Sequence, residues 1–283
     1  MKNGRISSVL PTAALLAGPL AVLCHGESAL DSARAGGVRP AVAIGNIQAK
    51  GFPRLLSGNG WETTVVLLDL GATPVTFRQS FLGNTGSPTS FTVQLQSNTT
   101  PLTTSALQGT LQPNGMITYT LHDDGSSVRE GWSLITFDAI QNQLGGYAIL
   151  RHAAAAGGLS FEVTLPLGDL QDFSAHLPFD NSGGFQTEIT AVNPASNLAA
   201  HVRLTYFNSQ GEVMLLDVMT LKPGEQATFV LPNTYPDLAN QSGMIAIASD
   251  INCLAVAGLR YNPSSGAIAS VPVMNFGSMI NLQ

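Results

Sequence analysis

Two segments of this chain, about 110 residues apart, carry the same pattern of strand and turn residues. Leu111–Leu121 reads LQPNGMITYTL and Leu221–Leu231 reads LKPGEQATFVL, with leucine, proline and threonine at matching places. The match continues outside these segments, because Trp61–Thr63 (WET) parallels Phe185–Thr187 (FQT). A unit of this length is too long for a solenoid repeat and fits a β-sandwich of about 100 residues. The chain is therefore predicted to fold as two similar domains in tandem.

The residues between these matching segments are typical of short antiparallel strands. Phe91–Gln96 (FTVQLQ) and Met116–Leu121 (MITYTL) alternate apolar and polar side chains, which is the period of a strand with one buried face. Gly, Pro and Asn residues separate the runs, and no segment has a convincing helical face. We therefore predict an all-β fold of two tandem, immunoglobulin-like antiparallel β-sandwiches, with domain 1 at residues 47–172 and domain 2 at residues 173–283.

The N-terminus has the features of an export signal. Two basic residues precede the apolar run Val9–Cys24, which is interrupted by prolines and too short to span a membrane. We predict a signal peptide at residues 1–28, a linker or flexible arm at residues 29–46, and a secreted or cell-surface protein. Leu23 stands where a lipoprotein signal needs a small residue, which argues against lipid anchoring at Cys24.

Removal of the signal would leave Cys253 as the only cysteine. It lies in an apolar run, CLAVAGL, and is predicted to be a small buried side chain and not a nucleophile. A single cysteine has no intramolecular disulfide partner, so each domain is expected to be stabilised by its own apolar core.

Composition excludes several classes of partner. The chain has 12 Lys and Arg residues against 18 Asp and Glu, a net charge of −6, and only 11% charged residues. No basic stripe is present to neutralise phosphates, so no nucleic acid is expected as a partner. No second apolar stretch is long enough to span a membrane. The expected partner is therefore a protein or a polysaccharide at the cell exterior.

The candidate ligand-binding residues are one aromatic residue and one arginine from each copy. Trp61 and Phe185 follow glycine-containing turns at the ends of their sandwiches. An exposed ring there would offer a platform for carbohydrate, and packing into the core is the competing interpretation. Arg151 and Arg260 each follow a leucine near a strand end, and serve either as structural polar contacts or as part of a repeated binding groove. The second tryptophan, Trp132, is predicted to pack inside.

An acidic loop in the first copy is the candidate metal site. Asp123 and Asp124 end a strand and Glu130 follows them. Ca²⁺ binds several carboxylate and carbonyl oxygens, so this loop is a candidate calcium site. The DxDxDG spacing of a calcium loop is absent, however, and Asp-Asp-Gly is also a good turn sequence. Ca²⁺ is the only cofactor that the sequence suggests.

No catalytic motif stands out. The chain has no GxSxG elbow, no HExxH zinc pair and no glycine-rich nucleotide loop. Two carboxylates for glycoside hydrolysis can come together from distant positions in a sequence. An extracellular hydrolase with a site between the domains therefore remains an alternative.

Three segments carry a resemblance to a known kind of protein: GNGWETT at 58–64, LPFDNSGGFQTEITAVNP at 177–194 and GLRYNPSSGAIASVPVM at 258–274. With these segments the chain resembles uncharacterised exported bacterial proteins that contain two tandem immunoglobulin-like β-sandwich repeats. The resemblance extends from about Trp61 to Met274. It implies a fold and export, and it implies no functional residue.

The leading functional prediction is a non-catalytic exported protein that presents a binding or adhesion surface. One alternative is a carbohydrate-binding or accessory module of a secreted system, and the other is the hydrolase. Fold alone does not decide among them.

Overall fold

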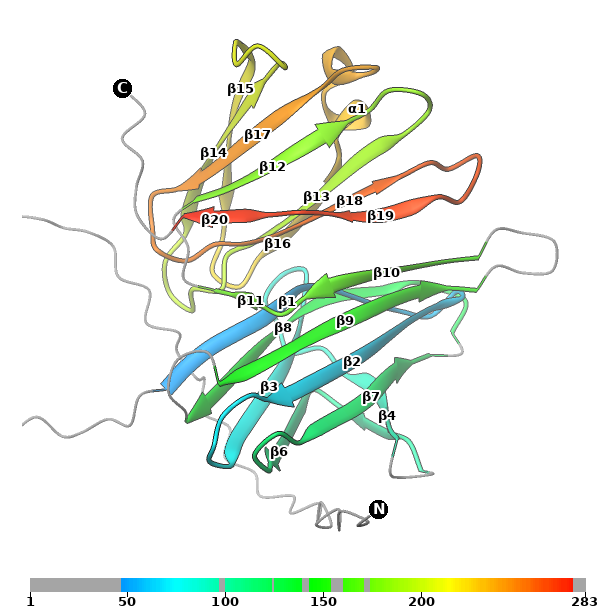
Figure 1. The fold of residues 1–283 in the computed structure, drawn as a ribbon, viewed down its shortest axis with the longest axis vertical. Coiled ribbons are helices and arrows are strands. Elements are labelled where there is room, and N and C mark those ends of the chain that lie inside the picture. Colours follow the sequence, from blue (N-terminus) through cyan, green and yellow to red (C-terminus); the bar gives the residue numbers. More distant parts are fainter. Residues whose placement is uncertain are drawn as a thin grey trace, which may run out of the picture.

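The computed structural model describes residues 47–96, 100–123, 125–138, 143–153, 160–170 and 174–276. Four antiparallel sheets pair into two β-sandwiches, one above the other in Figure 1. The predicted all-β fold of two tandem sandwiches is therefore confirmed. The predicted signal peptide, the arm at residues 29–46, Cys24 and Asp124 lie outside the described residues. Within the described ranges, no helix has the length and apolar character needed to cross a membrane.

In the part of the chain that the structure describes, the first sandwich contains eleven strands, β1 to β11. One sheet has the order β11-β1-β8-β3-β6, and the other has the order β10-β9-β2-β7-β4-β5. The bounds are β1 Ile47–Ser57, β2 Trp61–Asp69, β3 Val75–Gly83, β4 Phe91–Leu95, β5 Leu102–Thr104, β6 Ala106–Leu111, β7 Met116–His122, β8 Arg129–Asp138, β9 Leu144–His152, β10 Phe161–Pro166 and β11 Gly168–Asp169.

The second sandwich contains the remaining strands and two short helical turns. Its sheets have the orders β15-β14-β17-β12-β20 and β16-β13-β18-β19. The bounds are β12 Ser174–Asp180, β13 Gln186–Val192, β14 Ala200–Phe207, β15 Val213–Leu221, β16 Gln226–Val230, α1 Leu231–Thr234, the 3₁₀ turn Pro236–Leu238, β17 Ser242–Ser249, β18 Ala255–Tyr261, β19 Ile268–Val271 and β20 Met274–Phe276.

The two sandwiches have the same strand order, as the sequence repeat predicts. Read backwards, β20-β12-β17-β14-β15 matches β11-β1-β8-β3-β6, and β19-β18-β13-β16 matches β10-β9-β2-β7. The first copy adds the pair β4 and β5 at one sheet edge, between β3 and β6 in the chain. In each copy the first two strands lie in opposite sheets, whereas an immunoglobulin constant domain has both in one sheet. The strand order therefore does not support the immunoglobulin-like part of the prediction.

Buried polar side chains repeat with the strands and fix the alignment of the copies. Thr63 Oγ1 accepts a hydrogen bond from the backbone N–H of Leu56 and donates to its carbonyl. Thr187 makes the same two contacts with Asp180, again seven residues earlier. Because neither threonine side chain is exposed, these bonds satisfy polar groups that water cannot reach.

A glycine in each copy marks a close approach of two strands. A Cβ atom at Gly131 would lie 2.3 Å from the carbonyl oxygen of Leu82, and one at Gly243 would lie 1.9 Å from that of Phe207. Real Cβ atoms do not come this close to a carbonyl oxygen. The repeated Gly131 and Gly243 are therefore explained by sterics on neighbouring strands.

The strand registers correct one detail of the predicted alignment. Arg151 lies opposite Glu62 on β2, one position away from the buried Thr63. Arg260 lies opposite Thr187 itself on β13. The two arginines are thus one residue out of step, and a shift of one residue turns a side chain to the other face of its sheet. They are not equivalent residues of a repeated groove.

The core of the first sandwich holds a hydrogen-bonded polar chain that the second lacks. The hydroxyl of Tyr119 donates to Gln79 Oε1, and Gln79 Nε2 donates to Ser133 Oγ over 2.9 Å. Burial raises the pKa of the Tyr119 phenol well above its ordinary value, so it remains a donor. The equivalent positions of the second copy are Phe229, Leu204 and Ile245. All three hydrogen-bonded positions are therefore polar in the first copy and apolar in the second.

We expect Tyr119→Phe to lower the free energy of unfolding by about 1–3 kcal/mol, because it leaves the buried Gln79 Oε1 without a donor. Urea denaturation followed by circular dichroism measures this loss. The triple variant Tyr119→Phe, Gln79→Leu, Ser133→Ile installs the apolar set of the second copy and should lose less than the single variant. A triple variant that is less stable than Tyr119→Phe alone would contradict this account.

Cys253 is wholly buried, as predicted. The prediction that it is the only cysteine concerns the protein without its signal segment, and it stays a prediction. Cys24, the other cysteine of the sequence, lies outside the described residues.

Candidate functional site

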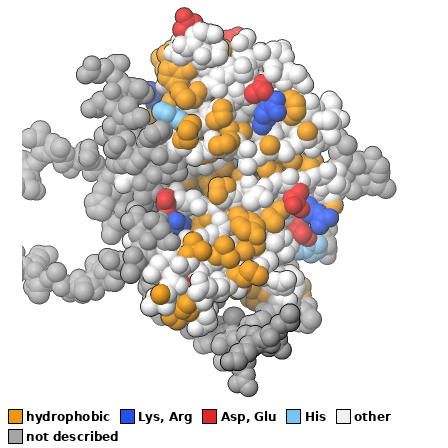
Figure 2. All heavy atoms as spheres, in the orientation of Figure 1, with side chains coloured by type: hydrophobic (Ala, Val, Ile, Leu, Met, Phe, Trp, Pro, Cys, Tyr) orange, Lys and Arg blue, Asp and Glu red, His pale blue; other side chains and the backbone are white. Residues whose placement is uncertain are grey.

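The two sandwiches pack directly against each other through apolar side chains. In Figure 1, β10 of the first body runs alongside β19 of the second, and the two strands are in contact. Figure 2 shows hydrophobic side chains gathered over the middle of this face, between the bodies. One buried cluster combines residues of both copies: Leu56, Leu150, Val163, Leu165, Ala257 and Leu259. Part of the contact between the sandwiches is therefore a separate buried apolar cluster, to which both sandwiches contribute residues.

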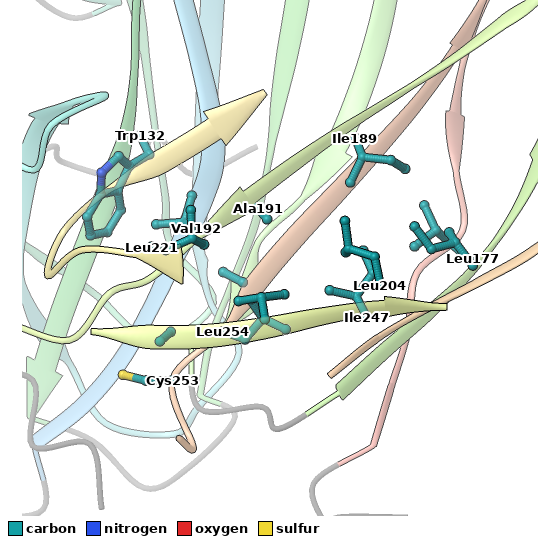
Figure 3. Close-up of a cluster of buried hydrophobic side chains, with 14 of the residues drawn as sticks. Trp132, Leu177, Ile189, Ala191, Val192, Leu204, Leu221, Ile247, Cys253 and Leu254 are labelled. Atoms are coloured by element: carbon teal, nitrogen blue, oxygen red, sulfur yellow. The ribbon is translucent and has the colours of Figure 1, made fainter. Parts of the chain in front are cut away.

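Trp132 is buried between the sandwiches. Its neighbours on β8, Ser133 and Ile135, point into the first sandwich, so strand alternation turns Trp132 outward. Its ring is only 1% exposed because it belongs to the apolar cluster of the second body, next to Val192 and Leu221 in Figure 3. The burial predicted for Trp132 is confirmed, but the second sandwich supplies most of the cluster that covers it.

Backbone and polar contacts hold the same junction. Trp132 Nε1 donates to the carbonyl of Gly224 over 3.0 Å. Gln226 Nε2 donates to the carbonyl oxygen of Pro53 over 2.6 Å. The backbone N–H of Gln226 donates to the carbonyl oxygen of Asn84. A Cβ atom at Gly86 would lie 2.7 Å from the Cα atom of Gly224, so these two turns touch through their backbones.

A largely buried arginine joins the two bodies electrostatically. Arg54 Nε lies 3.4 Å from Glu130 Oε1 in the first sandwich, and Arg54 Nη1 pairs with Glu188 Oε1 in the second. Thr228 Oγ1 donates to Glu130 Oε1 over 3.0 Å. Burial lowers the pKa of the Arg54 guanidinium, and Glu130 opposes that shift. The positive charge of Arg54 is therefore compensated by Glu130 from its own sandwich and by Glu188 from the other.

A β-bulge gives Arg54 its direction. Phe52 pairs with Ser133 and Leu55 pairs with Gly131, so β1 has one more residue than β8 between these two pairs. Pro53, which has no N–H to donate to the ladder, occupies this irregular stretch. Such a bulge turns the following side chain out of the regular alternation, here towards the second sandwich.

A cavity of about 270 Å³ opens next to this ion pair, between the two sandwiches. Three of its lining residues are aromatic: Trp61, Phe161 and Tyr261. Arg54, Glu188 and Asn262 contribute polar groups, and the rest of the lining is Leu259, Pro263, Gly266, Ala267 and Ile268. The wall is thus mainly apolar, with few polar groups, as is common for small-molecule sites.

Trp61 is held in place by other rings. Its centroid lies 5.3 Å from that of Phe161 in an edge-to-face arrangement and 5.0 Å from that of His152. His152 in turn stacks on Phe161 at 5.0 Å. Because its neighbours fix its position, the half-buried Trp61 is a rigid wall of the cavity.

A second cavity, of about 390 Å³, also has Trp61 among its lining residues. Its lining includes Trp61 together with Glu62, His122, Asp123 and Arg151, so it is much more polar than the first. Glu62 Oε2 lies 3.7 Å from His122 Nδ1. Trp61 is therefore shared by an apolar cavity between the sandwiches and a polar cavity at the end of the first one.

The structure separates the predicted ligand-binding residues into two groups. Trp61 and Arg151 line the same polar cavity. Phe185 and Arg260 instead contact each other, with the guanidinium carbon 3.5 Å from the ring centroid, and Arg260 Nη2 lies 2.6 Å from Asp180 Oδ2. Hydrogen bonds from Ser182, opposed by burial and assisted by Arg260, lower the pKa of the Asp180 carboxyl. This pair therefore has the geometry of a structural contact.

The predicted metal residues occupy different environments. Asp123 Oδ1 accepts a hydrogen bond from the backbone of Gly125 over 2.9 Å, and its Oδ2 lies 3.3 Å from Arg129 Nε. Glu130 binds Arg54 at the contact between the sandwiches. Within the described ranges, no three His, Cys, Asp or Glu side chains are grouped in a way that would hold a metal ion. Asp123 thus has the contacts of a turn residue.

Sequence reasoning missed Arg54, Glu188, Tyr261 and Phe161. The only available signal was Pro53 inside an otherwise regular strand, which indicates a bulge. The other three stand in ordinary strand positions, and only the packing of one sandwich on the other brings them together.

The chain matches no protein-family model and no curated protein sequence.

Proposed function

We propose that this protein is an exported, non-catalytic binding protein whose ligand site is built around Trp61. The observation that carries the proposal is that Trp61 belongs to the lining of both cavities, and that its ring packs against Phe161 in the lining of the interdomain cavity. A ring in such a position offers a large contact area at low cost in conformational entropy, because its neighbours already hold it. The apolar signal-like segment at Val9–Cys24 supports export.

The lining of the interdomain cavity favours binding over hydrolysis. Glycoside hydrolysis generally requires two carboxyl groups on either side of the scissile bond. Among the described residues that line this cavity, Glu188 is the one carboxylate, and it is paired with Arg54. A carboxylate in an ion pair is a poor proton donor because the pair stabilises its charged form.

Tryptophan fluorescence offers a site-specific test of this proposal. The chain has two tryptophans, and Trp132 is buried, so a ligand that enters either cavity should change mainly the emission of Trp61. We expect a panel of soluble glycans, peptides and envelope fragments to contain at least one compound that changes the emission in a saturable way. Trp61→Phe should abolish the change, and Trp132→Phe should retain it.

The same experiment distinguishes a binding protein from an enzyme. A bound compound should be recovered chemically unchanged after long incubation. Conversion of the compound, lost in Glu188→Gln, would overturn the proposal in favour of a hydrolase. A saturable response that persists in Trp61→Phe would place the binding site elsewhere.

A further inference from the structure

We propose that the ligand of the Trp61 site is a neutral glycan that occupies both cavities, with one sugar ring in the interdomain cavity beside Trp61. This inference rests on the proposed binding function and specifies its ligand class.

The charges of the interdomain cavity favour a neutral ligand. Its two charged lining residues, Arg54 and Glu188, are paired with each other, so neither is left to attract a counter-ion. A charged ligand would meet one like charge and one opposite charge, so the pair as a whole offers it no net attraction. Transfer of a charged ligand into a mainly apolar wall without a matching partner is costly.

The aromatic residues favour a ligand with an apolar face and a polar rim. Trp61, Phe161 and Tyr261 supply apolar surface, while Asn262 and the Arg54–Glu188 pair place hydrogen-bonding groups in the same lining. A pyranose ring presents C–H groups on its faces and hydroxyl groups around its edge, which matches this division. A purely apolar compound would leave the polar groups of the wall without partners.

The second cavity extends the site beyond one ring. The interdomain cavity, at about 270 Å³, is close to the lower limit of roughly 300 Å³ for small-molecule pockets. The polar cavity adds about 390 Å³ and shares Trp61 with it. Its groups Glu62 and Arg151 lie opposite each other on neighbouring strands and provide acceptors and donors for hydroxyl groups. A chain of two or more sugars therefore fits better than a monosaccharide.

The test is isothermal titration of the full-length protein with neutral oligosaccharides of one to six units, made of glucose, mannose, xylose or N-acetylglucosamine. Oligogalacturonate, choline and a short neutral peptide are the comparison probes. We expect at least one neutral series to bind, with affinity that rises from one unit to three and then levels off. Trp61→Ala should weaken binding of every length by roughly 30-fold, as truncation of a central aromatic contact does.

Two variants of the polar cavity provide the matched control. Arg151→Ala and Glu62→Gln should weaken the trimer by about fivefold and leave the monosaccharide unchanged, because only longer ligands reach these groups. Equal losses for the monosaccharide and the trimer would overturn the two-cavity arrangement. Both residues lie on the outer face of the first sandwich, so their replacement should not disturb the core.

The outcomes separate this inference from the proposed function. Trp61-dependent binding of oligogalacturonate, choline or peptide, with no neutral glycan bound, would overturn the ligand class and leave the Trp61 site standing. Glycan binding that is unchanged in Trp61→Ala would overturn the site itself. If none of the neutral series binds, the glycan inference is wrong.

Discussion

Replacing Trp132 by alanine is expected to lower the free energy of unfolding by about 3–5 kcal/mol, the usual cost of removing a buried large aromatic side chain. The ring is 1% exposed and lies in the apolar cluster of the second sandwich, although it belongs to a strand of the first. Its truncation would leave a void at the contact, and the hydrogen bond from Nε1 to Gly224 would also be lost. The loss is therefore shared by both domains.

Differential scanning calorimetry should reveal this sharing directly. The intact protein should unfold in one transition, because each sandwich is stabilised by contact with the other. Trp132→Ala should separate the unfolding into two transitions or shift the whole transition to lower temperature. Trp132→Phe keeps most of the apolar surface and loses only the N–H donor, so it should cost much less. A Trp132→Ala variant with wild-type unfolding would show that the contact adds nothing to stability.

Replacing Arg54 by methionine is expected to have a similar effect, a loss of about 3–5 kcal/mol, for an electrostatic reason. Methionine fills part of the same space but leaves Glu130 and Glu188 without their shared cation in a largely buried place. Two like charges would then lie close together across the contact. Chemical denaturation, monitored by circular dichroism, measures the loss.

The rescue experiment identifies the cause. Adding Glu130→Gln and Glu188→Gln to Arg54→Met removes the unpaired charges, and replacing a whole buried ion cluster by neutral groups is often neutral or stabilising. Glutamine at position 130 also keeps an acceptor for Thr228. We therefore expect the triple variant to recover most of the lost stability. If it is as unstable as Arg54→Met, the loss comes from packing and not from charge.

The architecture could be predicted because its signals are local and repeated. The alternation in Met116–Leu121 places Tyr119 and Leu121 on one face, and both are buried. The match of Leu111–Leu121 with Leu221–Leu231 corresponds to the equivalent strands β7 and β16. Periodicity of two within a strand, and its recurrence after about 110 residues, is enough to infer two antiparallel sandwiches.

The candidate site could be predicted only in part. Trp61 was identified because a tryptophan after a glycine turn stands out in the sequence. Arg54 and Glu188 were missed because alternation tells which face of a sheet points into its own sandwich, and says nothing about what covers the outer face. The mismatch of Arg151 and Arg260 has a related cause, since an alignment of letters does not detect a one-residue change of register.

The backbone contact between Gly86 and Gly224 has a consequence for the spacing of the two sandwiches. Where two turns meet with no room for a methyl group, the sandwiches cannot move closer together at that point without a steric clash. A side chain introduced at Gly86 or Gly224 would therefore push the sandwiches apart and alter the cavity that lies between them.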